Sequence, residues 1–171
     1  MMELQEIARN TIKAKLEGKG YEVPEKIKHR LADKRACFVT LKKHGQLRGC
    51  VGSLQARQAL WKDIQENAIN AAFHDFRFPA LHKHELDNLE IEISVLSKPE
   101  KLGIGKQVYD KITKDVGVIL KHPDGEATFL PQVWEQLPDK RQFLQTLSRK
   151  AGLQADAWQE AEIWVYKVEK Y

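Results

Sequence analysis

Apolar residues recur every three or four positions near the start of the chain, from Leu4 to Leu16. This spacing places them on one stripe of an amphipathic helix that ends near Gly18. The same spacing returns over residues 58–73 and over residues 138–150. The pattern therefore predicts three helices, each of which packs one face against a core.

β-Branched and aromatic residues dominate residues 36–41, and a similar run over residues 47–54 follows the turn residues His44 and Gly45. Two such runs joined by a short glycine-containing turn predict an antiparallel hairpin. Residues 89–95 alternate strictly between apolar and polar types. This alternation predicts a further strand that has one wet face and belongs to an antiparallel sheet.

A second hairpin is predicted over residues 116–120 and 127–130, because the segment between them holds a Pro-Asp-Gly turn signal. Residues 163–168 predict the last strand, and residues 98–105 are predicted to be a loop. Helices and strands interleave irregularly, without repeats or a Pro/Gly-rich linker. We therefore expect an α+β fold with mixed or antiparallel sheets and flanking helices.

The composition is that of a globular protein long enough to form one domain or two small lobes, with 171 residues, 42% of them hydrophobic and 30% charged. The net charge of +4 arises from 28 basic and 24 acidic residues that are scattered along the chain, which argues against a nucleic-acid partner. The sequence has no signal-peptide pattern and no apolar run of roughly 18 residues, so we expect neither secretion nor a membrane span. Its two cysteines indicate thiols in a reducing compartment, and the cytoplasm is the predicted location.

The most unusual segment is the run Leu-Arg-Gly-Cys-Val-Gly-Ser at residues 47–53, where two glycines, a thiol and a guanidinium fall in a predicted strand. Period-two alternation places Arg48, Cys50 and Gly52 on one face. A guanidinium beside a thiol favours the thiolate, which acts as a nucleophile or metal ligand. The alternative is that Cys50 is a small structural residue of the core. Because the short turn puts Cys37 opposite a residue near Gly52, we expect no disulfide between the two cysteines.

A second cluster, Phe-His-Asp-Phe-Arg-Phe, spans residues 73–78 at the end of the second predicted helix. His74 is a candidate general base for Cys50, with Asp75 orienting its imidazole, as nucleophilic catalysis requires. The alternative is an ion pair between Asp75 and Arg77 that closes the helix end. His82 and His84 are too few for a metal site, and the common cofactor motifs are absent, so the sequence assigns no metal and no cofactor.

The chain resembles the AMMECR family, whose prokaryotic members include AmmeMemoRadiSam system protein A. The resemblance is carried by residues 47–52, by residues 71–78, and by residues 127–133 together with 150–152. It extends over residues 4–170, as one domain. The resemblance implies two lobes with the Arg-Gly-Cys segment facing a cleft between them. It also implies Memo-like and radical-SAM proteins as pathway partners, but no established reaction.

Two functions are expected from these features. The first is a binding or accessory module for a partner protein or a small anionic molecule, because two arginines suit carboxylate or phosphate groups. Pro131 directs the chain off a sheet edge, which places Gln132 at the rim of the same site. The second is an enzyme with Cys50 as nucleophile and His74 as base. The predicted binding residues are Arg48, Gly49, Gly52, Asp75, Arg77 and Gln132.

Overall fold

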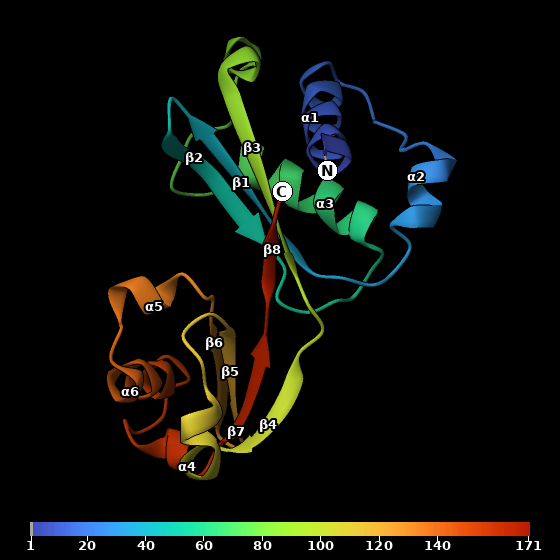
Figure 1. Ribbon diagram of the computed structural model, residues 1–171. Coiled ribbons are helices and arrows are strands. Elements are labelled where there is room, and N and C mark those ends of the chain that lie inside the picture. Colours follow the sequence, from blue (N-terminus) through green and yellow to red (C-terminus); the bar gives the residue numbers. More distant parts are fainter. Residues whose placement is uncertain (1) are drawn as a thin grey trace. The chain divides into compact units, whose positions relative to one another are not determined.

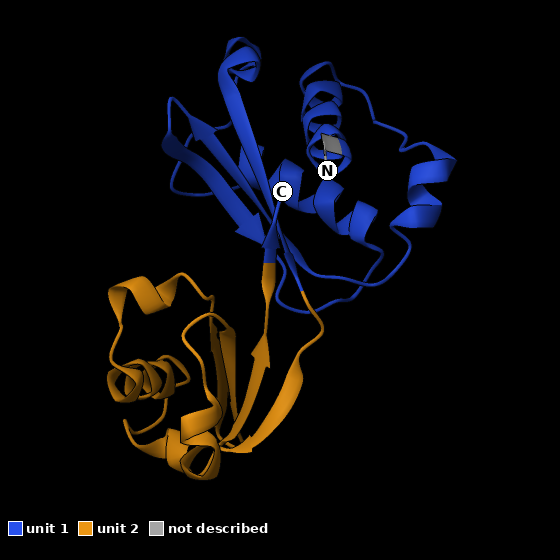
Figure 2. Ribbon diagram, viewed as in Figure 1, with its two compact units in different colours: residues 1–96, 169–171 blue, residues 97–168 orange. Residues whose placement is uncertain are grey.

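The computed structural model describes residues 2–171, which form two compact units (Figures 1 and 2). Unit 1 contains the residues up to Leu96 together with Glu169–Tyr171, and unit 2 contains Ser97–Val168. Each unit has its own four-stranded antiparallel sheet with flanking helices, which confirms the predicted α+β class. No helix within the described residues is long and apolar enough to cross a membrane.

The sheet of unit 1 begins with the predicted hairpin, in which β1 (Cys37–Lys43) pairs antiparallel with β2 (Gln46–Gly52). His44 and Gly45 both have positive φ, 51° and 75°, as a two-residue hairpin turn requires. The strand order β2-β1-β3-β8 is completed by β3 (Leu89–Leu96) and β8 (Val168–Lys170). Strand β2 is therefore an edge strand, because β1 is its only neighbour in the sheet within residues 2–171.

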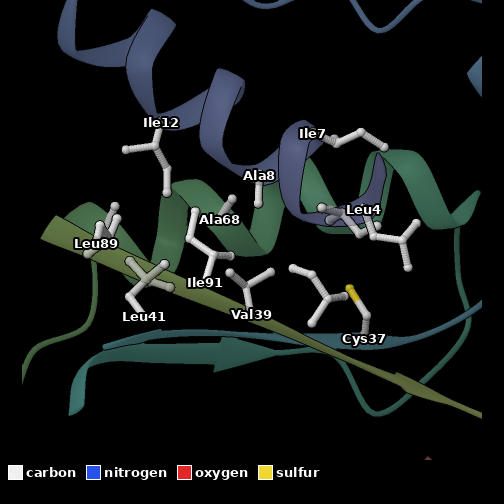
Figure 3. Close-up of a cluster of buried hydrophobic side chains, with 14 of the residues drawn as sticks. Leu4, Ile7, Ala8, Ile12, Cys37, Val39, Leu41, Ala68, Leu89 and Ile91 are labelled. Carbon is white, nitrogen blue, oxygen red and sulfur yellow. The ribbon is translucent and has the colours of Figure 1, made fainter. Parts of the chain in front are cut away.

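Helices α1 (Met2–Leu16) and α3 (Leu60–Phe73) cover one face of this sheet. Figure 3 shows their apolar stripes packed against side chains of β1 and β3. These contacts explain the three- and four-residue spacing of apolar positions in both helices. The shorter elements of unit 1 are α2 (Glu25–Arg30) and the 3-10 helix η1 (Lys83–Asn88). The largest fully buried side chains of this core are Ile7, Ile12, Leu41, Ile64 and Ile93.

The sheet of unit 2 has the order β4-β7-β5-β6. Its predicted hairpin is confirmed, since β5 (Gly117–His122) pairs with β6 (Gly125–Phe129). Helix α6 (Lys140–Lys150), also predicted, buries Phe143, whose ring stacks on Trp134 at 3.6 Å. The other elements are β4 (Glu100–Ile104), α4 (Gly105–Val108), η2 (Tyr109–Lys111), α5 (Val133–Gln136), η3 (Ala157–Gln159) and β7 (Glu162–Tyr166).

The prediction of a loop over residues 98–105 is wrong, because β4 lies there and pairs antiparallel with β7. Its register shifts between Lys101 and Gly103, and Gly103 has a φ of 140°. A short strand with a bulge and a glycine has little β-propensity of its own and depends on its partner. The single strand predicted over residues 163–168 is in fact two, because Lys167 separates β7 from β8.

Candidate functional site

Strand β2 contains a β-bulge at Arg48. Lys42 lies opposite Leu47 and Leu41 lies opposite Gly49, so Arg48 has no partner in β1. A bulge of this kind bends the strand and interrupts the alternation of side chains. The strict alternation that placed Arg48 and Cys50 on one face therefore does not run through this part of β2.

The guanidinium of Arg48 is engaged by Glu85, which the sequence analysis did not identify. Its Nε donates to Glu85 Oε1 at 3.0 Å and its Nη2 donates to Oε2 at 3.1 Å. Only 10% of the Arg48 side chain is exposed, and its buried Nη1 has no hydrogen-bond partner among the described residues. The bonds from Arg48, with the backbone N–H of His82, lower the pKa of Glu85 to about 2 despite its burial. The positive charge of Arg48 is thus buried and neutralised by Glu85.

Cys50 lies at the free edge of the sheet with its side chain beside Thr40. Its Sγ is 3.3 Å from Thr40 Oγ1. Ser53 N–H donates to Cys37 O, so the alternation of an antiparallel ladder turns the backbone groups of Cys50 away from β1. The N–H of Cys50 donates to Asp75 Oδ2 at 2.9 Å, and its carbonyl accepts from Arg77 Nη2 at 3.4 Å. The two side chains thus occupy the position of a neighbouring strand.

Asp75 and Arg77 form the ion pair that the sequence analysis gave as the structural alternative. Arg77 Nε and Nη2 donate to the two oxygens of Asp75 at 3.0 and 2.8 Å, and Arg77 N–H adds a third bond at 3.2 Å. These bonds from Arg77, and the one from Cys50, hold the pKa of Asp75 well below its usual range. Asp75 is buried, whereas 45% of the Arg77 side chain is exposed. Phe76, between them, is 97% exposed.

His74, the predicted base for Cys50, is not hydrogen-bonded to it within the described residues, and the catalytic role of the two residues stays a prediction. His74 is exposed at the C-terminal end of α3, where its N–H donates to Asn70 O. Within residues 2–171 no hydrogen bond joins its imidazole to Cys50 or to Asp75. The carboxylate of Asp75 cannot orient the imidazole as expected, because Arg77 and the backbone of Cys50 already occupy its oxygens.

Both glycines of the segment permit a close approach within unit 1. A Cβ on Gly49 would lie 2.2 Å from the carbonyl oxygen of Ala71 in α3. A Cβ on Gly52 would lie 2.2 Å from Cγ of Phe38, whose ring lies over this glycine. Packing therefore accounts for both glycines, and their role in substrate binding stays a prediction.

The sequence analysis also did not identify a buried polar network that lies behind the β1–β2 hairpin. The carboxylate of Asp63 accepts the N–H of Cys37 at 3.0 Å, the hydroxyl of Ser53 at 2.9 Å and an amide N–H of Asn67 at 3.0 Å. Burial, and then the charge of Asp63, raise the pKa of Cys37. The available signal was that Asp63 and Asn67 lie four residues apart on the apolar stripe of the predicted helix.

The two cysteines are free thiols in different surroundings, as expected from the hairpin register. Cys37 is fully buried in the core, and Cys50 lies opposite Thr40 and is partly exposed. Within the described part of the chain, no three potential metal ligands of the His, Cys, Asp or Glu type lie together.

The two remaining segments of the resemblance meet within unit 2. Lys150 Nζ donates to the carbonyl of Thr128 at 2.9 Å, and a Cβ on Gly125 would lie 2.1 Å from the carbonyl oxygen of Ala151. Gln132 immediately precedes α5 in the same unit. Its predicted proximity to Cys50, which belongs to unit 1, stays a prediction.

Comparisons with known proteins extend over nearly the whole chain. Residues 5–171 match the model of the AMMECR1 family. Protein NEQ441 of Nanoarchaeum equitans is 40% identical over 98% of this chain and 96% of that protein. Protein MK0488 of Methanopyrus kandleri is 37% identical over 98% of this chain and 86% of its own length.

A solved structure is also similar, that of the uncharacterized protein PH0010 from Pyrococcus horikoshii. It has a TM-score of 0.81 and 31% sequence identity, and the match covers 98% of this chain and 88% of that one. The structural match thus extends over both units, as the family match does. The chain therefore belongs to the AMMECR1 family.

Proposed function

We propose that this protein is a ligand-binding accessory module, and that it recognises an anionic group of a small molecule or partner protein at the edge of β2 around Cys50. The observation that carries the proposal is the bidentate Asp75–Arg77 pair held against the backbone of Cys50. It fixes a half-exposed guanidinium beside a partly exposed thiol. Memo-like and radical-SAM proteins are the partners that the family suggests.

Charge around this edge favours an anion. Lys43 and Arg48 share the single carboxylate of Glu85, and Arg77 pairs with Asp75. Three cationic side chains thus share two carboxylates in these ion pairs. The two pairs belong to one cluster, because the guanidinium carbons of Arg48 and Arg77 lie 6.0 and 5.5 Å from the ring centre of Phe78. The excess positive charge supports recognition of a negative ligand.

Arg77 has donors left for such a ligand. Asp75 and the carbonyl of Cys50 take its Nε and Nη2, and its Nη1 forms no hydrogen bond within residues 2–171. A guanidinium whose orientation is already fixed loses little side-chain freedom when it binds a carboxylate or phosphate.

The test is a thermal-shift screen of the protein with inorganic phosphate, small phosphate esters and small carboxylates. We expect at least one of these anions to raise the melting temperature of the wild type but not of Arg77→Gln. Arg149→Gln is the matched control, because Arg149 is an exposed arginine of α6 that lies outside unit 1. If no anion distinguishes Arg77→Gln from the wild type and from the control, the proposal is wrong.

A second candidate, an enzyme with Cys50 as nucleophile, is favoured by the partial exposure of the thiol and by the hydroxyl of Thr40 beside it. Its test is the rate of iodoacetamide labelling of Cys50 between pH 5 and 10. An activated thiolate gives a midpoint well below about 8.5, the value of an ordinary thiol. A midpoint at or above that value would leave Cys50 without a nucleophilic role.

A further inference from the structure

A hollow with a volume of about 430 Å³ lies at the C-terminal end of β2, two residues beyond Cys50. Its size falls within the range of small-molecule sites. It is lined by Gly52, Ser53, Leu54, Gln55 and Arg57, all from the end of β2 and the loop that follows.

The wall formed by Gly52 has free backbone groups. Gly52 lies opposite Phe38, and Cys50 lies opposite Thr40 two positions earlier. The alternation that turns the N–H and carbonyl of Cys50 away from β1 therefore turns those of Gly52 away as well. Asp75 and Arg77 cover these groups at Cys50, whereas no side chain of the described residues hydrogen-bonds them at Gly52. The edge of the sheet is thus covered by side chains at Cys50 and left open at Gly52.

Arg57 provides a positive charge at this hollow. Its Nε and Nη2 donate to Gln55 Oε1 at 3.1 and 2.8 Å. An amide oxygen orients the guanidinium without neutralising it, and Arg57 forms no ion pair within residues 2–171. The buried carboxylate of Asp63 behind the loop accepts its hydrogen bonds from the protein, among them Ser53 Oγ at 2.9 Å. Among the described residues that line the hollow, Arg57 alone carries a charge.

Two arginines consequently border one stretch of sheet edge. Arg77 lies at Cys50 and Arg57 lies at the hollow beside Gly52. Outward-facing residues of a strand are separated by roughly 7 Å, twice the rise per residue. The two arginines are thus associated with neighbouring outward-facing positions of β2, Cys50 and Gly52, and a ligand with two acidic groups can engage both.

From this juxtaposition we infer that the ligand is an elongated molecule with an acidic group at each end. One group binds Arg77 beside Cys50, the other binds Arg57 in the hollow, and the connecting part passes the open backbone of Gly52. The inference rests on the proposed anion recognition at Arg77 and adds the second anchor, the length and the doubly acidic character of the ligand.

The experiment measures binding of a homologous series of linear dicarboxylates, from succinate to suberate, by isothermal titration calorimetry, with butyrate as the monocarboxylate reference. We expect one chain length to bind at least about tenfold more tightly than butyrate, because the second contact becomes intramolecular. Arg57→Gln should reduce the affinity of that ligand to the affinity that butyrate has for the same variant. Arg149→Gln should change neither. Linear bisphosphonates of matched length distinguish phosphate from carboxylate recognition.

The outcomes separate the two proposals. If butyrate or methylphosphonate binds through Arg77 but no diacid binds more tightly, the elongated ligand is wrong and anion recognition stands. If Arg57→Gln weakens the monoacid as much as the diacid, both arginines serve one subsite, which also overturns the inference. If no acid of either kind binds to the wild type, anion recognition at Arg77 fails and the inference fails with it.

Discussion

Asp75 accepts a hydrogen bond from the backbone N–H of Cys50 at 2.9 Å, and this bond joins the segment after α3 to the edge of β2. Two segments that stand out in the sequence, residues 47–52 and 71–78, are therefore one structural feature. Arg77 strengthens the link through its bond to the carbonyl of Cys50. A change at any of the three residues is expected to affect the other two.

Replacement of Asp75 by asparagine should destabilise the protein and reduce the dependence of its stability on pH. The folded state lowers the pKa of Asp75, so its stabilising effect is present above the unfolded pKa near 3.9 and is lost as the pH falls below it. We expect a loss of about 1–3 kcal/mol at pH 7, since asparagine keeps one acceptor but not the charge. Urea unfolding at pH 7 and pH 3 should show a smaller difference for Asp75→Asn than for the wild type; equal differences would contradict the assignment.

Removal of Arg48 should be costly because, among the described residues, it leaves buried Glu85 with Lys43 as its only cationic side-chain partner. For Arg48→Met we expect a loss of about 3 kcal/mol in the free energy of unfolding, and a partial recovery in the double variant Arg48→Met/Glu85→Gln. In the wild type, the contribution of Glu85 is present above its unfolded pKa near 4.3 and is lost as the pH falls toward about 2. A double-mutant cycle by urea unfolding measures the coupling, and strictly additive effects would argue against the pair.

The three glycine variants Gly49→Ala, Gly52→Ala and Gly20→Ala should differ in stability. A Cβ at Gly49 would lie 2.2 Å from a helix backbone oxygen, whereas at Gly52 the nearest backbone oxygen, that of Cys37, is at 2.7 Å and the nearer Phe38 ring can move. We expect Gly49→Ala to lose about 3 kcal/mol or more and Gly52→Ala to lose less. Gly20, with nothing within 4 Å, serves as the control and should change by less than about 0.5 kcal/mol. Thermal denaturation ranks the three, and a reversed order of Gly49→Ala and Gly52→Ala would be inconsistent with the structure.

The two thiols should react one at a time. Cys37 is fully buried with a raised pKa, whereas Cys50 is partly exposed. Iodoacetamide at pH 8 should therefore label the native protein at Cys50 alone, and Cys37 only after unfolding in urea. Peptide mass spectrometry locates the label. Rapid native labelling of Cys37 would show that the core around Asp63 opens more easily than its packing indicates.

The elements that the sequence predicts well are those with a strong local pattern. Helix α1 has a regular apolar stripe, and the β1–β2 hairpin has β-branched runs around His44 and Gly45. Strand β4 has neither kind of signal. It exists because β7 offers it a hydrogen-bonding edge, and no local pattern reports that partner.

The residues of the candidate site are predictable from the sequence, but their pairing is predictable only in part. The sequence directs attention to Cys50, Asp75 and Arg77, which lie together in unit 1. It does not reveal Glu85, because the pair with Arg48 joins residues 37 positions apart. It also does not reveal the bulge at Arg48, which depends on how two strands align and not on the residues of one.

The division of unit 1 along the chain has a consequence for the order of folding. Tyr171 exchanges two backbone hydrogen bonds with Ile93, at 2.8 and 3.0 Å, so the last strand of the first sheet comes from residues that follow unit 2 in the sequence. Everything between Ser97 and Val168 forms unit 2. On the ribosome, strands β1 to β3 emerge first. One edge of β3 stays unpaired until all of unit 2 and then β8 have been synthesised. That edge is open to incorrect pairing throughout this interval, and prompt folding of unit 2 shortens the search by bringing β8 back beside it.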